Sequence, residues 1–423
     1  MLKLNKLFSI FYISNNKRNF IIIAVFTIAF AFSACGGGGS SDSPGGEDGN
    51  GHTHTWGEWT VITNPTCTTT GEGTRECTKC GETDPNTIIP IDPEAHAWTA
   101  WTVTTPATVL AAGVETESCS RCSILGANTR PITQLTPDVT IDLAVGTGNI
   151  INSSPAGSTI LIKGISNGYR YIKIKNATDI YIADNTTILG FEEIVVTPRA
   201  LEVPDGAKIT GGGNNIHIEY YEQHQTQDGH DILQEGGIGI FGNGTLELAG
   251  VFGNIFGGYS DIFGYGGDAI RTSGALKISG IIGEIRGGWG STINGRQVRG
   301  GYGINSSGDI TISSSIGKIS GGEGRNSSSS SFRTDGGIGI RGSYITITGY
   351  VGAIYGGRAQ GRRVEEEGGH GIFVFGLGCG VNLTGATIPG GVHGGDAVMG
   401  GQPGRAINGP AAEGWTSAQH WPY

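Results

Sequence analysis

Apolar and polar positions between residues 236 and 391 follow one pattern that recurs five times. Each copy has a Gly pair, an Ile four residues after the pair begins, and a run in which apolar and polar residues alternate. Each of the four complete copies then has Gly-x-Ile-x-Gly-Gly followed by a variable segment, and the copies are 30, 34, 36 and 32 residues long. The Gly pairs begin at Gly236, Gly266, Gly300, Gly336 and Gly368. Self-similarity at this period is typical of stacked repeats.

The aligned copies indicate which positions face inward. The first column reads Ile240, Ile270, Ile304, Ile340 and Ile372. The alternating run places apolar residues on either side of a polar one, as in Leu276-Lys277-Ile278, and a third column carries Ile255, Ile285, Ile319 and Ile354. Three short strands per copy, with Gly where the chain turns, describe one coil of a β-solenoid. We therefore expect an all-β, right-handed parallel β-helix in which like residues of successive coils stack about 4.8 Å apart and form internal Ile and Leu ladders.

The predicted solenoid spans residues 137–408, because short β-branched runs separated by Gly, Asn, Asp and Pro begin near Pro137. The first runs are irregular, as capping coils often are. Residues 409–423 are expected to close the last coil. A polar stretch at 219–235 interrupts the pattern and contains His224, Asp228, His230 and Asp231. A metal or acid/base role and a surface loop are both open for it, and the absence of matching groups in later coils favours the loop.

The variable segments of the repeats all follow the second Gly pair, so stacking would place them along one edge. This edge carries aromatic and Arg residues, among them Tyr259, Trp289, Arg296 and Arg299. Such residues favour a contact surface for glycans or for host or matrix proteins. The alternative is that solvent-facing loops vary freely.

Residues 54–95 and 96–136 form a separate duplication with a constant offset of 42 residues. We call these segments the first and second modules. Both begin with His-x-Trp-x-x-Trp and carry a Cys-x-x-Cys near the end, and they resemble Trp/Cys repeats found beside other domains in bacterial surface proteins. Small modules of this kind need a covalent or metal staple. The Trp pairs are expected to form their cores, and an aromatic platform for sugars is the alternative.

The first module has the residues for a structural zinc site. Cys67, Cys77 and Cys80, with His54 or His96 from a module boundary, would give a Cys3His set. In an exported chain a disulfide is equally open. The second module has Val109 in place of Cys67, which leaves Cys119 and Cys122 as its cysteines and favours a disulfide there.

The N-terminal 34 residues have the form of an export signal, with basic residues, an apolar core and small residues before Cys35. Phe32-Ser33-Ala34-Cys35 resembles a bacterial lipobox, although Phe32 stands where Leu is usual. The resemblance implies lipid attachment at Cys35 and anchoring to the bacterial outer membrane or cell surface. Residues 35–53 are rich in Gly, Ser and acidic residues and predict a flexible linker.

The composition excludes two classes of function. A net charge of −10 and only 15% charged residues exclude a nucleic-acid binder and a polybasic protein of the membrane surface. The repeats, such as Gly266-Gly267-Asp268-Ala269-Ile270, resemble polysaccharide-binding and pectate-lyase-like β-helices of bacterial surface proteins. Those lyases use clustered Asp residues and a basic residue, but here only Asp268 and Asp396 are acidic at this position. We expect a non-catalytic adhesive or carbohydrate-binding protein; a polysaccharide lyase or hydrolase and a passive stalk are the alternatives.

Overall fold

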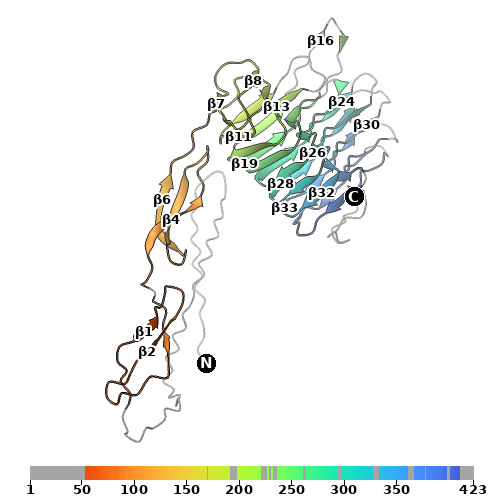
Figure 1. Ribbon diagram of the computed structural model, residues 1–423. Coiled ribbons are helices and arrows are strands. Elements are labelled where there is room, and N and C mark those ends of the chain that lie inside the picture. Colours follow the sequence, from red (N-terminus) through yellow and green to blue (C-terminus); the bar gives the residue numbers. More distant parts are fainter. Residues whose placement is uncertain are drawn as a thin grey trace, which may run out of the picture. The chain divides into compact units, whose positions relative to one another are not determined.

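The chain consists of two compact units, residues 1–92 and 93–423. The computed structural model describes residues 53–92, 94–168, 170–190, 198–220, 226–227, 230–231, 236–260, 263–292, 297–326, 333–360, 366–376, 378–397 and 401–409. All regular structure within these ranges is β, which confirms the predicted class (Figure 1). In the same ranges no helix is long and apolar enough to cross a membrane. The predicted export signal, Cys35, nearly all of the linker, Arg296 and most of the closing tail lie outside the described residues.

Each module folds into a three-stranded antiparallel sheet. The first sheet is β1 (Thr60–Thr63), β2 (Gly71–Thr74) and β3 (Ile88–Ile89), and the second is β4 (Trp98–Thr105), β5 (Gly113–Cys119) and β6 (Leu125–Ile132). The expectation that the Trp pairs form the cores is wrong for the second module. Trp98 and Trp101 are 40% and 36% exposed, and the Arg130 guanidinium lies 4.4 Å from the Trp101 ring centroid. A single three-stranded sheet has no second layer against which its indoles could be buried.

Residues 137–408, which we call the repeat domain, consist mainly of long parallel sheets. The nine-stranded sheet contains β8 (Ile150–Asn152), β10 (Ile172–Ile174), β13 (Arg199–Val203), β18 (Ile238–Gly242), β21 (Ile270–Thr272), β26 (Ile304–Ser306), β31 (Ile340–Gly342), β36 (Ile372–Val374) and β39 (Ile407–Asn408). Strands from successive repeats are neighbours in this sheet. This stacking is consistent with the predicted solenoid.

The sixteen-stranded sheet bends to make two further faces of the repeat domain. Its main path contains β7 (Val139–Asp142), β9 (Thr159–Lys163), β11 (Asp179–Ile182), β14 (Ala207–Gly212), β19 (Leu246–Phe256), β22 (Leu276–Ile278), β27 (Ile310–Ile312), β32 (Tyr344–Ile347) and β37 (Gly380–Asn382). The other face contains β12 (Thr187–Gly190), β15 (His217–Tyr220), β23 (Ile281–Arg286), β28 (Ser315–Ser320), β33 (Tyr350–Val351), β34 (Ile354–Tyr355) and β38 (Val392–His393). β19 takes part in both faces because it pairs with β22 at one end and β23 at the other.

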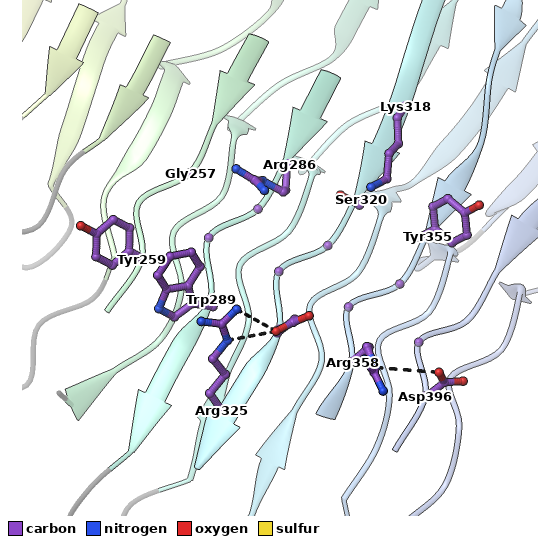
Figure 2. A pocket seen from close by; sticks show the side chains of 18 of the residues that line it. Gly257, Tyr259, Arg286, Trp289, Lys318, Ser320, Arg325, Tyr355, Arg358 and Asp396 are labelled. Carbon is purple, nitrogen blue, oxygen red and sulfur yellow. Dashed lines mark hydrogen bonds and ion pairs between the residues drawn. The ribbon is translucent and has the colours of Figure 1, made fainter. Parts of the chain in front are cut away.

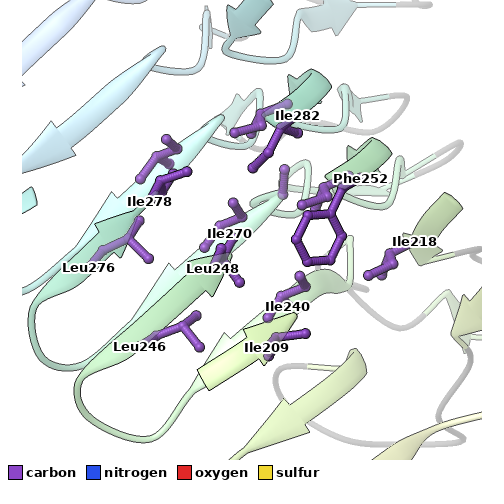
Figure 3. Close-up of a cluster of buried hydrophobic side chains, with 14 of the residues drawn as sticks. Ile209, Ile218, Ile240, Leu246, Leu248, Phe252, Ile270, Leu276, Ile278 and Ile282 are labelled. Atoms are coloured by element: carbon purple, nitrogen blue, oxygen red, sulfur yellow. The ribbon is translucent and has the colours of Figure 1, made fainter. Parts of the chain in front are cut away.

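The apolar columns read from the sequence form the core of the repeat domain. Ile240 pairs with Ile270, Ile270 with Ile304, and the register continues to Ile340 and Ile372. All five isoleucines are fully buried, and Figure 3 shows Ile240 and Ile270 packing beside Leu246 and Leu276 of the next column. Burial of each such side chain contributes about 1.5–3 kcal/mol.

The Gly pairs form a narrow neck where the chain leaves and re-enters each repeat. Gly288 N–H donates to Gly267 O at 2.9 Å, Gly301 N–H donates to Gly288 O at 2.8 Å, and Gly322 N–H donates to Gly301 O at 2.8 Å. The same zigzag runs from Gly237 to Gly404. An outgoing Gly pair, such as Gly287-Gly288, precedes a variable segment, and a returning pair, such as Gly300-Gly301, follows it. The two kinds of pair alternate in one hydrogen-bonded stack. A Cβ on Gly322 would lie 1.8 Å from Gly288 O, so only Gly fits.

Beyond the neck, the variable segments form arms that are partly regular. A four-stranded sheet contains β20 (Phe263–Gly264), β24 (Gly290–Thr292), β29 (Gly324–Asn326) and β35 (Ala359–Gln360), and β25 (Val298–Arg299) pairs with β30 (Thr334–Asp335). A short hairpin of β16 (Thr226–Gln227) and β17 (His230–Asp231) lies within the predicted 219–235 interruption. His224 and Asp228 of that segment lie outside the described residues.

Glu202 is the centre of a buried polar cluster near the first repeats. Its side chain is 3% exposed and accepts hydrogen bonds from Tyr171 and Arg199, from Lys173 Nζ at 2.9 Å and from Asn243 Nδ2 at 3.0 Å. Burial alone would raise the pKa of Glu202, but these donors outweigh it and lower the pKa to about 2. The carboxylate is therefore the stable form in the folded protein.

We expect Glu202→Gln to lower the free energy of unfolding by about 2 kcal/mol at neutral pH, because an amide cannot replace the charged acceptor. The folded pKa is depressed, so the stabilisation is fully present above the unfolded value of about 4.3 and is lost as pH falls towards 2. Urea unfolding across this pH range measures it. A variant that follows the same pH profile as the wild type between pH 5 and 2 would contradict the assignment.

We expect Gly322→Ala to destabilise the repeat domain by more than about 3 kcal/mol, because the added methyl group would overlap the backbone of Gly288 in the preceding repeat. Gly148→Ala is the matched control. A Cβ at Gly148 meets no atom within 4 Å, and the change should stay within about 0.5 kcal/mol. Urea unfolding followed by circular dichroism measures both. Equal stability of the two variants would show that the neck is not tightly packed.

Candidate binding groove and metal centres

A groove of about 380 Å³ runs across successive repeats where the arms leave the neck. The residue that directly follows the outgoing Gly pair in each repeat lines it: Tyr259, Trp289, Glu323, Arg358 and Asp396. The Gly pairs themselves form part of its wall. Because Gly has no side chain, these five residues and their neighbours determine the chemistry of the surface (Figure 2).

Trp289 is held in a stack. The ring centroids of Tyr259 and Trp289 lie 4.4 Å apart at an interplanar angle of 21°, and the Arg325 guanidinium carbon lies 4.3 Å from the Trp289 centroid. Tyr259 comes from the preceding repeat and Arg325 from the following one, and Figure 2 shows the indole between them. The faces of the half-buried indole are thus covered, and its edge remains for a ligand.

Charged side chains continue the groove. Arg325 Nη2 lies 2.9 Å from Glu323 Oε2, and Arg358 Nε lies 3.9 Å from Asp396 Oδ2. The full set of charged lining residues is Glu219, Arg286, Lys318, Glu323, Arg325, Arg358 and Asp396, four basic and three acidic. The groove is therefore nearly neutral, with a small basic excess in a chain of net charge −10. Fixed guanidinium groups of this kind donate hydrogen bonds in defined directions.

The sequence located part of this groove. Tyr259 and Trp289 line it as expected, whereas Arg299 does not: its guanidinium carbon lies 4.2 Å from the Tyr302 ring centroid and its Nε is buried. Sequence reasoning missed Arg286 and Tyr355. Both directly precede an outgoing Gly pair. Residues just before each outgoing pair, as well as those just after it, could therefore have been predicted to line the groove.

The two acids at the lyase-like position lie in different environments. Asp268 is 1% exposed and accepts hydrogen bonds from Arg271 Nε at 2.6 Å, the Tyr302 backbone N–H at 2.8 Å and Asn305 Nδ2 at 2.8 Å. Asp396 is exposed in the groove. These contacts give Asp268 a structural role, since its acceptor positions already face donors of the protein.

No family model, curated protein or solved structure matches this chain.

Each module brings one His and two Cys together. In the first, Cys80 Sγ lies 3.5 Å from His54 Nδ1, and Cys77 completes a group whose ligand atoms all lie within 4.8 Å of one another. His54 stacks on Trp56 with centroids 4.9 Å apart, and its Nε2 lies 3.8 Å from Glu82 Oε2. Such a cluster can hold a metal ion, and a carboxylate near the other ring nitrogen is a common outer partner of a ligating His.

The predicted metal residues are divided between the two modules. Cys77 and Cys80 lie together as expected, with His54 as their His. His96 instead accompanies Cys119 and Cys122 in the second module, where Cys122 Sγ lies 3.5 Å from His96 Nδ1. Cys67 is 6% exposed in the first module and is not part of the His54, Cys77 and Cys80 group, so the predicted Cys3His set is wrong at Cys67. The sequence offered His54 and His96 as alternatives, and the 42-residue offset assigns one to each Cys pair.

The Cys119 environment favours a thiolate. Burial raises the pKa of Cys119, but hydrogen bonds with His96, with the backbone of Arg121 and with Cys122 lower it to about 5. A thiol with this pKa is ionised at neutral pH, and the thiolate is the form that binds metals.

Proposed function

We propose that the protein is a non-catalytic, surface-displayed binding protein whose repeat domain is a right-handed parallel β-helix that holds a polysaccharide in the groove. The stack of Tyr259, Trp289 and Arg325 carries this proposal. An indole edge beside a fixed guanidinium offers an apolar surface and directed donors at one place. Sugars present the same mixture of apolar C–H patches and hydroxyl acceptors.

The shape of the groove supports an extended ligand. Its five leading positions come from consecutive repeats, so they extend over roughly 19 Å at about 4.8 Å per step. A linear polymer could contact each position in turn. The pairing of Glu323 with Arg325 and of Asp396 with Arg358 favours binding over acid/base catalysis, since each carboxylate lies beside a cation that stabilises its ionised form.

We also propose that the chain is exported and anchored through a lipid on Cys35. The order of basic residues, apolar core, small residues, Cys and polar linker supports this proposal. Anchoring would display the binding groove at the outer membrane or cell surface, where glycans or matrix proteins are accessible.

We further propose that the metal of the first module is zinc. Its donors are one imidazole nitrogen and two sulfurs, which are donor types that Zn²⁺ prefers. The site would be a staple for a module whose three short strands enclose few buried side chains.

We expect Trp289→Ala to weaken glycan binding more than about tenfold, because it removes the centre of the stack. A glycan array identifies the polymer, and isothermal titration then measures its affinity for the wild type and the variant. Tyr350→Ala, an aromatic that is 44% exposed and does not line the groove, is the control. Release of shortened or unsaturated sugars would instead identify a lyase or hydrolase, and binding to no glycan across a broad panel would indicate a passive stalk.

We expect Cys35→Ser to release the protein from the membrane fraction into the soluble fraction, because the lipid would have no thiol to which it could be attached. Metabolic labelling with an alkyne fatty acid should mark the wild type and not the variant. Cys379→Ser, which changes a cysteine of the repeat domain, should leave both readouts unchanged. Labelling that persists in Cys35→Ser would place the lipid elsewhere.

A further inference from the structure

The two modules build the same turn around their Cys pairs. In the first, Cys77 N–H donates to Glu82 O at 2.8 Å and Gly81 N–H donates to Cys77 O at 2.9 Å. In the second, Cys119 N–H donates to Ile124 O at 2.9 Å and Ser123 N–H donates to Cys119 O at 2.8 Å. The turn brings the two cysteines of each Cys-x-x-Cys to the same side, beside the His of their own module.

Backbone conformation supports the equivalence of these turns. Gly81 has φ +74°, and Ser123 at the matching position has φ +61°. A non-Gly residue is rarely found in this left-handed region and is held there only by its surroundings. The second module thus has the same turn although Ser123 stands where the first module has Gly81. The contacts around Ser123 must therefore offset the cost of this conformation.

The histidines are placed in the same way. His96 stacks on Trp98 with centroids 4.9 Å apart, as His54 stacks on Trp56, and in both modules Nδ1 faces the second Cys of the pair at 3.5 Å. A tetrahedral Zn²⁺ with bonds of about 2.3 Å to sulfur and 2.0–2.1 Å to nitrogen would separate the two ligand atoms by about 3.5 Å. The observed spacing therefore fits a shared metal ion.

We propose that the second module holds its own zinc-type ion on His96, Cys119 and Cys122, so that the chain carries two metal centres. The inference extends the zinc proposed for the first module, and it reverses the sequence-based preference for a disulfide here. The preference for a disulfide assumed that the second module has no metal site because Val109 replaces Cys67. Val109 is 2% exposed and packs in the module interior, while the ligand set depends on His96, which the offset preserves.

Zinc per chain and site-specific thiol protection test this inference in the full-length purified protein. We expect two zinc ions per chain by elemental mass spectrometry, and one in Cys122→Ser. Zinc should protect Cys119 and Cys122 of the wild type from alkylation until EDTA is added, as peptide mapping will show. This second readout needs no variant, so misfolding of Cys122→Ser cannot mimic it. Cys379→Ser is the matched control and should retain two ions.

The possible outcomes separate the two centres. One zinc that Cys80→Ser removes and Cys122→Ser leaves would overturn the second centre and keep the first. One zinc with the opposite dependence would support the second centre and refute the first. A Cys119–Cys122 disulfide in protein purified under a thiol-free inert atmosphere, seen as a peptide mass lacking two hydrogens, would overturn the inference.

Discussion

The repeat domain depends on the backbone hydrogen bonds between its Gly pairs. Outgoing and returning pairs alternate in one stack, and from Gly258 to Gly404 each N–H donates to the pair before it, so these bonds all point the same way. Hydrogen bonds aligned in this manner polarise one another. The stack holds the two ends of each arm together, so insertions in the arms can vary in length while the columns of isoleucine stay in register.

The neck also determines where function can reside. Its glycines leave no side chains between the buried columns and the arms, so a groove opens there that is lined by the first residues on either side. Tyr259 and Trp289 lie in adjacent repeats at this position, and parallel stacking brings their rings to 4.4 Å. The same stacking brings Arg358 close to Asp396. Ligand binding in the groove would thus use the regular spacing that the core imposes.

The two modules are stabilised in a different way from the repeat domain. Each module has a single three-stranded sheet, and the tryptophans of the second module lie at its surface with Arg130 beside Trp101. Few apolar side chains are buried, and cysteines are prominent among them, with Cys77 and Cys119 2% and 1% exposed. Two centres of one His and two Cys would supply through metal bonds what the repeat domain obtains by burying isoleucine.

The β class, the stacked isoleucine columns and the position of the variable edge could all be predicted from the residue pattern, because periodic burial and the Gly pairs are visible locally in the sequence. Tyr259 and Trp289 were predicted on that edge for the same reason. The folded chain was needed to show that the Gly pairs interleave, that Arg325 covers Trp289 while Arg299 lies against Tyr302, and that His96 lies with Cys119 and Cys122. These outcomes depend on contacts between residues far apart in the chain, and side-chain direction at such contacts has no periodic signal.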